Sequence, residues 1–268
     1  MSEFLTSDNT KIYYDIQGSG KPVIFIHGFG ARSNVFRIPQ RILSKEFQTI
    51  SYDLRGHGMS RDSGEEVSME LLARDLYEII AYLGLDDVTL VGWSMGGSVI
   101  FEYIKNYGCK NLEGLAIVDT GPKLVNTSGW SLGLYKGAYD ENQAKSALNL
   151  MMESWSHYSK NFMTKMGPNL DEKGLEIAIA SMEGNEAKHM ISVWKDLVSK
   201  DYRNILGKIT IPTMIIMGGK SSLYSRSTGE YLKDNIKNSK LLIFEDNGHL
   251  LVQENPTKFS RALMDFIK

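Results

Sequence analysis

One serine in a short glycine-rich segment has surroundings that predict covalent chemistry. The segment reads Val91-Gly92-Trp93-Ser94-Met95-Gly96-Gly97, which places Ser94 at the centre of a G-x-S-x-G motif. An apolar run over 88–91 precedes the motif and a helical pattern follows to about 106. In a strand–turn–helix of this kind the hydroxyl projects from a tight turn, beside helix N–H groups that favour negative charge. We therefore predict that Ser94 is a nucleophile, the alternative being a purely structural glycine turn.

Two further segments supply the groups that such a serine needs. His249, in Asn247-Gly248-His249, precedes the last predicted helix, and a histidine on a flexible loop can accept the serine proton as a general base. The turn His27-Gly28-Phe29-Gly30 follows an apolar run near the N-terminus. We expect the backbone N–H groups of Phe29 and Met95 to form an oxyanion hole.

The elements that must position these residues alternate between two patterns. Short apolar runs are separated by stretches of helical periodicity, which is typical of a parallel sheet built from βαβ units. The predicted strands cover 11–17, 23–26, 48–52, 88–91, 115–118, 213–217 and 241–244, and the clearest helices cover 68–83, 94–106 and 256–267. Ser94 and His249 would then meet at the carboxyl edge of the sheet.

The segment 122–206 has a different character. It has no β-branched runs, yet it holds six of the thirteen methionines and three of the four tryptophans. We predict a helical lid over this range, inserted into a core domain formed by 1–121 and 207–268. Adaptable methionine and aromatic side chains suit an apolar binding surface, although a small helical core would use the same residues. The residues expected to contact substrate are Trp93, Trp130, Trp155 and Leu223.

These motifs resemble those of the α/β-hydrolase superfamily over nearly the whole chain, in particular its serine esterase and cofactor-free haloperoxidase-like branch. The segment 52–60, Tyr-Asp-Leu-Arg-Gly-His-Gly-Met-Ser, is similar to the loop after the fourth strand of that family. Gly248-His249 with Glu254-Asn255-Pro256 resembles its C-terminal signature. The resemblance implies an α/β fold with a mostly parallel eight-stranded sheet, flanking helices and an inserted helical lid. It also implies that His27 and His57 belong to structural turns.

The acid of the expected Ser-His-Asp triad departs from the common family pattern. In most relatives it follows the seventh strand in a Gly-x-x-Asp loop, but Ser221 occupies that position here, and no Asp or Glu occurs from 208 to 229. Asp119 ends the preceding strand, and some branches of the superfamily carry the acid there. We predict that Asp119 completes the triad. The alternatives are that Asp119 only caps the turn, that Asp246 serves, or that the triad is incomplete.

The overall composition narrows the classes of partner. Thirty basic and thirty-two acidic residues give a net charge of −2, which favours neither nucleic acid nor an anionic membrane as a partner. The single cysteine, Cys109, excludes an internal disulfide framework and fits a reducing compartment. The polar N-terminal segment resembles no export signal, so we expect a cytoplasmic protein. No metal or organic cofactor is expected, and the sequence leaves monomer and homodimer open.

We predict a serine hydrolase that cleaves a small or medium carboxylic ester through an acyl-enzyme. A serine at position 94 disfavours haloalkane dehalogenase and epoxide hydrolase chemistry, because those relatives use an aspartate nucleophile. The alternatives are a C–C bond or lactone hydrolase with the same triad, and a small-molecule receptor on the same fold with slow turnover.

Overall fold

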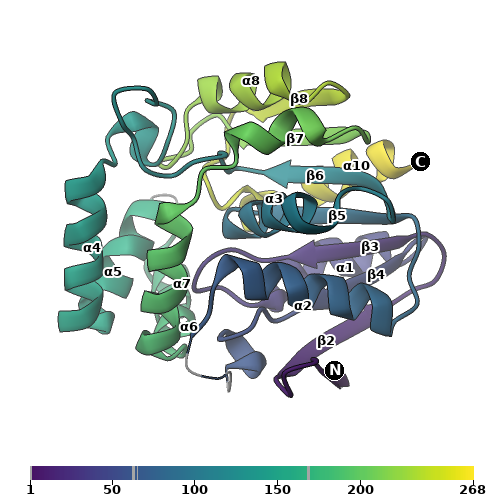
Figure 1. The fold of residues 1–268 in the computed structure, drawn as a ribbon, viewed down its shortest axis with the longest axis horizontal. Coiled ribbons are helices and arrows are strands. Elements are labelled where there is room, and N and C mark those ends of the chain that lie inside the picture. Colours follow the sequence, from purple (N-terminus) through teal and green to yellow (C-terminus); the bar gives the residue numbers. More distant parts are fainter. Residues whose placement is uncertain (1, 62–63, 65, 168–169) are drawn as a thin grey trace.

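In the computed structural model, residues 2–61, 64, 66–167 and 170–268 are described, and eight strands in this part of the chain form one sheet (Figure 1). The strand order is β1-β2-β4-β3-β5-β6-β7-β8, with β2 antiparallel to both of its neighbours and the remaining pairs parallel. The strands are β1 Ser2–Leu5, β2 Lys11–Gln17, β3 Pro22–Ile26, β4 Gln48–Tyr52, β5 Val88–Trp93, β6 Leu112–Val118, β7 Thr213–Gly218 and β8 Ser239–Phe244. The predicted mostly parallel sheet of eight strands is confirmed.

Helices cover both faces of the sheet, which explains why its central strands are continuous apolar runs. Every residue of β5 and β7 is buried. In Figure 1, α2 and α3 lie in front of the sheet while α1 and α10 lie behind it. The helices that flank the sheet are α1 Arg37–Leu43, α2 Met69–Tyr82, α3 Met95–Tyr107, α8 Arg226–Asn235, α9 Leu251–Glu254 and α10 Pro256–Ile267.

The amphipathic pattern of α2 shows how the sequence specifies these helices. Leu72, Leu76 and Ile79 are spaced by three or four residues and all are fully buried. The Ser68 hydroxyl accepts a hydrogen bond from the Leu71 N–H and so caps the first turn. No helix in the described part of the chain is long and apolar enough to cross a membrane.

A second group of helices lies beyond the carboxyl ends of the parallel strands, at the left of Figure 1. These are α4 Glu141–Glu153, α5 Trp155–Met166, α6 Glu172–Glu183 and α7 Ala187–Ser199. The described residues of 122–206 contribute no strand to the sheet. Their packing places α5, α6 and α7 against the turn that follows β3.

Candidate active site

Ser94 lies at the tight turn between β5 and α3. Its backbone has φ = 56° and ψ = −122°, a strained conformation for a residue other than glycine. The two glycines of the motif allow the turn, because a Cβ at Gly96 would lie 2.1 Å from the carbonyl oxygen of Ile26. A Cβ at Gly92 would lie 2.5 Å from the carbonyl oxygen of Gly96. The turn that these two glycines allow therefore places the Ser94 side chain above the carboxyl edge of the sheet.

His249 approaches this hydroxyl from the loop after β8. Its Nε2 lies 3.1 Å from Ser94 Oγ, and the whole residue is buried. The loop is held from two sides: Trp93 Nε1–H donates to the His249 carbonyl oxygen at 2.9 Å, and the Gly248 N–H donates to the Glu254 carboxylate at 2.7 Å. The imidazole is thus held at hydrogen-bond distance from the serine.

Asp119 contacts the other nitrogen of the imidazole. Its Oδ2 lies 2.5 Å from His249 Nδ1, and both side chains are fully buried. Asp119 directly follows β6, which pairs with β7, and its Oδ1 accepts a hydrogen bond from the Gly218 N–H at 2.9 Å. The structure therefore brings Ser94, His249 and Asp119 into one hydrogen-bonded chain.

Ser221 supports the same carboxylate from the neighbouring strand. Its hydroxyl donates to Asp119 Oδ2 at 2.7 Å and accepts hydrogen bonds from the N–H groups of Leu223 and Tyr224, each at 3.3 Å. Ser221, the position at which the family resemblance leads one to expect an acid, is therefore a hydrogen-bond donor to the carboxylate that follows β6. Burial raises the pKa of Tyr224 well above its usual value, so the phenol beside His249 stays protonated.

Two backbone N–H groups next to Ser94, those of Phe29 and Met95, have no acceptor among the described residues. Met95 is the first residue of α3, where a helix offers no intrahelical acceptor, and Phe29 lies in the turn after β3. Neither amide donates to any residue that the structure describes. Gly28 lets the turn approach the nucleophile, because a Cβ there would lie 3.0 Å from the Cβ of Ser94. The geometry suits stabilisation of an oxyanion.

His27 and His57 lie beneath the site, and both are fully buried. His27 Nδ1–H donates to the Gly28 carbonyl oxygen at 2.8 Å, while its Nε2 accepts from the Leu54 N–H at 3.0 Å. Both nitrogens of His27 are therefore used within the turns. His57 Nδ1–H donates to the Arg55 carbonyl oxygen at 3.0 Å. Burial lowers the pKa of His57 to about 3, so its imidazole is neutral at pH 7.

The low pKa of His57 predicts a loss of stability in mild acid. The unfolded chain binds a proton at this residue below about pH 6.5 while the folded chain does not, so stability falls as the pH drops from 6.5 toward 3. We expect His57 to lower the free energy of unfolding by about 2 kcal/mol between pH 7 and pH 5. Urea unfolding of wild type and His57→Gln at both pH values measures this contribution.

The exposed His157 on α5 gives the matched control for that measurement. In His157→Gln the free energy of unfolding should differ between pH 7 and pH 5 by the same amount as in the wild type. If the free energy of unfolding fell equally from pH 7 to pH 5 in His57→Gln and in the wild type, His57 would not be the source of the pH dependence.

Comparison with known proteins places this geometry in a family. The family model of the alpha/beta hydrolase fold matches residues 21–256. The chain belongs to the alpha/beta hydrolase fold family. An esterase from Exiguobacterium antarcticum has a similar structure, with a TM-score of 0.92 and 27% identity, the match covering 99% of this chain and 98% of that one.

Curated relatives have several activities. A non-heme haloperoxidase from Rhodococcus erythropolis is 26% identical, the match covering 98% of this chain and 97% of that protein. A 3-oxoadipate enol-lactonase from Acinetobacter baylyi is 23% identical over 92% of this chain and 88% of the relative. The chain is an enzyme of the hydrolase class.

The hydrolase has a small cavity directly at Ser94, which we call the inner cavity. Its volume is about 20 Å³, and its walls include Ser94, Phe29, Met95 and Leu223. This volume holds roughly one water molecule. As the side chains stand, only a small chemical group fits beside the nucleophile.

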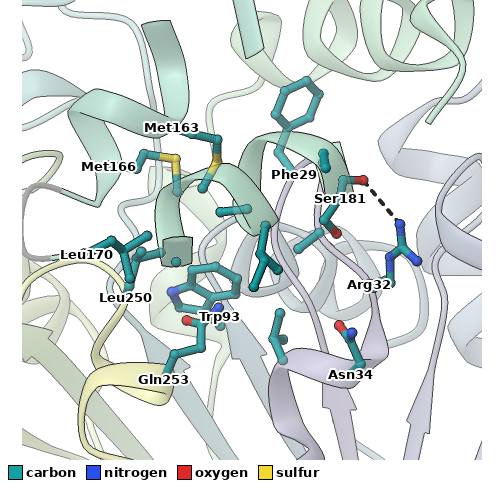
Figure 2. A pocket seen from close by; sticks show the side chains of 17 residues that line it. Phe29, Arg32, Asn34, Trp93, Met163, Met166, Leu170, Ser181, Leu250 and Gln253 are labelled. Carbon is teal, nitrogen blue, oxygen red and sulfur yellow. Dashed lines mark hydrogen bonds between the residues drawn. The ribbon is translucent and has the colours of Figure 1, made fainter. Parts of the chain in front are cut away.

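A larger outer cavity of about 550 Å³ adjoins the inner one (Figure 2). Phe29, Trp93 and Met166 line both cavities. The outer wall is largely apolar and comes mainly from the segment 29–35, α5, α6 and the segment around Leu250. A cavity of this size is typical of a small-molecule site. A substrate bound at Ser94 can therefore extend past these three side chains into the outer cavity.

The structure brings two of the four residues expected to contact substrate to these cavities. Trp93 and Leu223 line the inner cavity. Trp130 lies elsewhere: its indole N–H donates to the Lys123 carbonyl oxygen and the Arg203 guanidinium lies over its ring. Trp155 packs edge-on against Phe29, with ring centroids 6.3 Å apart, and lines neither cavity.

Several residues of the site were not singled out from the sequence. Ser98 lines the inner cavity, and its place one helical turn after Ser94 could have indicated this. Met166 could have been found only with the fold in hand, because helical spacing does not tell which face of α5 meets the nucleophile. Arg32, which lines the outer cavity, follows the turn at Phe29 by three residues.

Proposed function

We propose that this hydrolase cleaves carboxylic esters through an acyl-enzyme formed on Ser94. The observation that carries the proposal is the hydrogen-bonded chain from Ser94 Oγ to His249 and on to Asp119, with distances of 3.1 and 2.5 Å. Such a chain activates a hydroxyl that is otherwise a weak nucleophile. The esterase similarity supports the same class of reaction.

The proposed reaction has two halves. Ser94 Oγ attacks the ester carbonyl while His249 Nε2 accepts its proton, and Asp119 stabilises the imidazolium that forms. The N–H groups of Phe29 and Met95 hold the oxyanion of the tetrahedral intermediate. His249 then protonates the leaving alcohol, and the alcohol departs. In the second half His249 takes a proton from water while the water oxygen attacks the acyl-enzyme. The bond from the acyl carbon to Ser94 Oγ then breaks, His249 returns the proton to Ser94 Oγ, and the acid is released.

The two cavities divide the ester into a small and a large half. Because the inner cavity holds only about 20 Å³, one half of the ester must be small, such as an acetyl or a methyl group. The larger half occupies the outer cavity past Phe29, Trp93 and Met166. We propose that the segment 122–206 acts as the lid that closes both cavities over the core formed by 1–121 and 207–268.

Lactone hydrolysis is the second candidate, and the similarity to an enol-lactonase favours it. A lactone is a cyclic ester, so the same groups would act in the same order. The two substrate classes differ in shape: the alkoxide released by a lactone stays attached to the acyl chain, and both must fit together beside Ser94.

The test is a series of p-nitrophenyl esters of increasing acyl length. The acetate has one small half, whereas neither half of the octanoate fits the inner cavity. We expect kcat/KM to fall at least tenfold from acetate through butyrate to octanoate, while methyl octanoate remains a substrate. Labelling of the serine by a fluorophosphonate measures its activation independently.

The outcomes separate the candidate functions. Labelling without ester turnover, combined with hydrolysis of a small lactone, would favour the lactonase. Labelling with neither activity would point to the slow-turnover receptor. A protein that is neither labelled nor active would overturn the proposed nucleophile.

A further inference from the structure

The outer cavity has one charged side chain on a largely apolar wall. Among the described residues that line it, Arg32 alone carries a charge at neutral pH. Figure 2 shows Arg32 with Ser181 and Asn34 on one side of the cavity, and Met163 and Leu170 on the other. A ligand that spans the cavity would thus meet thioether and aliphatic side chains at one end and a guanidinium at the other.

This guanidinium has few partners within the protein. Its Nη2–H donates to the Ser181 carbonyl oxygen at 3.3 Å, and its buried Nε–H donates to no residue in the described part of the chain. The nearby Asp53 carboxylate does not pair with it. Its two oxygens instead accept backbone hydrogen bonds from Ser33 and Met59, each at 2.8 Å.

A half-buried arginine with unused donors suits one kind of ligand. Planar guanidinium donors match the two oxygens of a carboxylate, and the resulting hydrogen bonds are charge-assisted. Asn34 and Gln253 add neutral amides to the lining. One cation with neutral polar neighbours balances a single negative charge, which favours a carboxylate over a phosphate dianion.

We propose that the outer cavity binds a carboxylate at the far end of the larger half of the ester, with Arg32 as the specificity-determining residue. The substrate class is an ester whose alkyl chain crosses the apolar part of the cavity and ends in a carboxylate. This inference rests on the ester hydrolysis proposed above for the site at Ser94.

Matched pairs of esters test the preference. Monomethyl adipate is compared with methyl hexanoate, and 6-acetoxyhexanoate with hexyl acetate, so that each pair differs only in whether the chain ends in a carboxylate or a methyl group. We expect the wild type to have a higher kcat/KM for the anionic ester than for the neutral ester in at least one pair. Arg32→Gln should lower this ratio of the anionic to the neutral kcat/KM by about ten- to a hundredfold. Arg37→Gln removes an exposed arginine outside the cavity and should keep the wild-type ratio.

Binding to the Ser94→Ala protein separates this inference from the proposed reaction. Calorimetry with the same esters needs no turnover, and the anionic member should bind at least tenfold more tightly unless Arg32 is also replaced. If Arg32→Gln weakened the binding of both esters of a pair equally, Arg32 would only support α6 through Ser181, and the proposal would be overturned. Equal affinity of Ser94→Ala for charged and neutral esters would overturn it too, whether or not the wild type hydrolyses them.

Discussion

Replacing Ser94 with alanine is expected to lower kcat for p-nitrophenyl acetate by about 10⁴- to 10⁶-fold. The substitution removes the one oxygen that lies 3.1 Å from His249 Nε2, and with it the attacking group. Fluorophosphonate labelling should disappear at the same time. The fold should persist, because alanine and serine tolerate the positive φ at this turn about equally. Initial rates and the urea midpoint of the purified variant check both statements.

Ser98→Ala is the matched control for that experiment. It removes another hydroxyl from the wall of the inner cavity, and that hydroxyl has no hydrogen-bond partner in the described part of the chain. Its loss leaves no buried group newly unpaired, so we expect less than a tenfold change in rate. If Ser94→Ala kept more than a hundredth of the wild-type rate, another group would have to carry out the attack.

Asp119→Asn is expected to lower kcat by about 10⁴-fold with little change in KM. Asparagine keeps the volume of the side chain but removes the charge that stabilises the imidazolium. If its amide nitrogen faces His249 Nδ1, the imidazole must also take the wrong tautomer for accepting the Ser94 proton. Because the substitution acts on the chemical step, kcat measured at saturating substrate is the decisive quantity.

Two further variants make the assignment of the acid specific. Asp246→Asn tests the other carboxylate that the sequence analysis considered as the acid. Its side chain is 92% exposed and lies 3.4 Å from Lys220 Nζ, so the rate should stay within about twofold. The double variant Asp119→Asn/Ser221→Asp should regain part of the lost rate, because residue 221 contacts the same carboxylate position. Near wild-type turnover of Asp119→Asn would show that Asp119 is not the acid.

Much of the fold could be predicted from local patterns in the sequence. The buried parallel strands read as apolar runs, and α2 and α10 show amphipathic spacing, so their positions agree with the structure to within a few residues. The strand Ser2–Leu5 was missed, because four residues with one buried side chain carry no clear alternation. The helix Arg37–Leu43 was missed as well, since it spans two turns and contains Pro39.

The meeting of three predicted site residues was predictable from the sequence, because each of them follows a strand of the sheet. Ser94, Asp119 and His249 follow β5, β6 and β8, and the parallel order β5-β6-β7-β8 brings the carboxyl ends of these strands to one edge of the sheet. The cavity walls were not predictable in the same way, because they depend on which face each helix of 122–206 turns toward the sheet. Trp130 illustrates this. The aromatic composition of 122–206 suggested that Trp130 contacts substrate, but it lies in a loop closed by a bridge to Thr127, away from both cavities.

The contact between Ser221 and Asp119 also bears on how a buried acid can change strands during evolution. An ancestor without either carboxylate would lose about four orders of magnitude in rate, so that route is closed to an enzyme under selection. An ancestor with carboxylates at both positions would hold two acids in contact, and repulsion would keep one of them protonated. That neutral carboxyl would donate a hydrogen bond to its neighbour, as the Ser221 hydroxyl does now. A serine at position 221 could thus replace a protonated acid there without loss of the hydrogen bond to Asp119, which makes the arrangement with two carboxylates a workable intermediate in such a change.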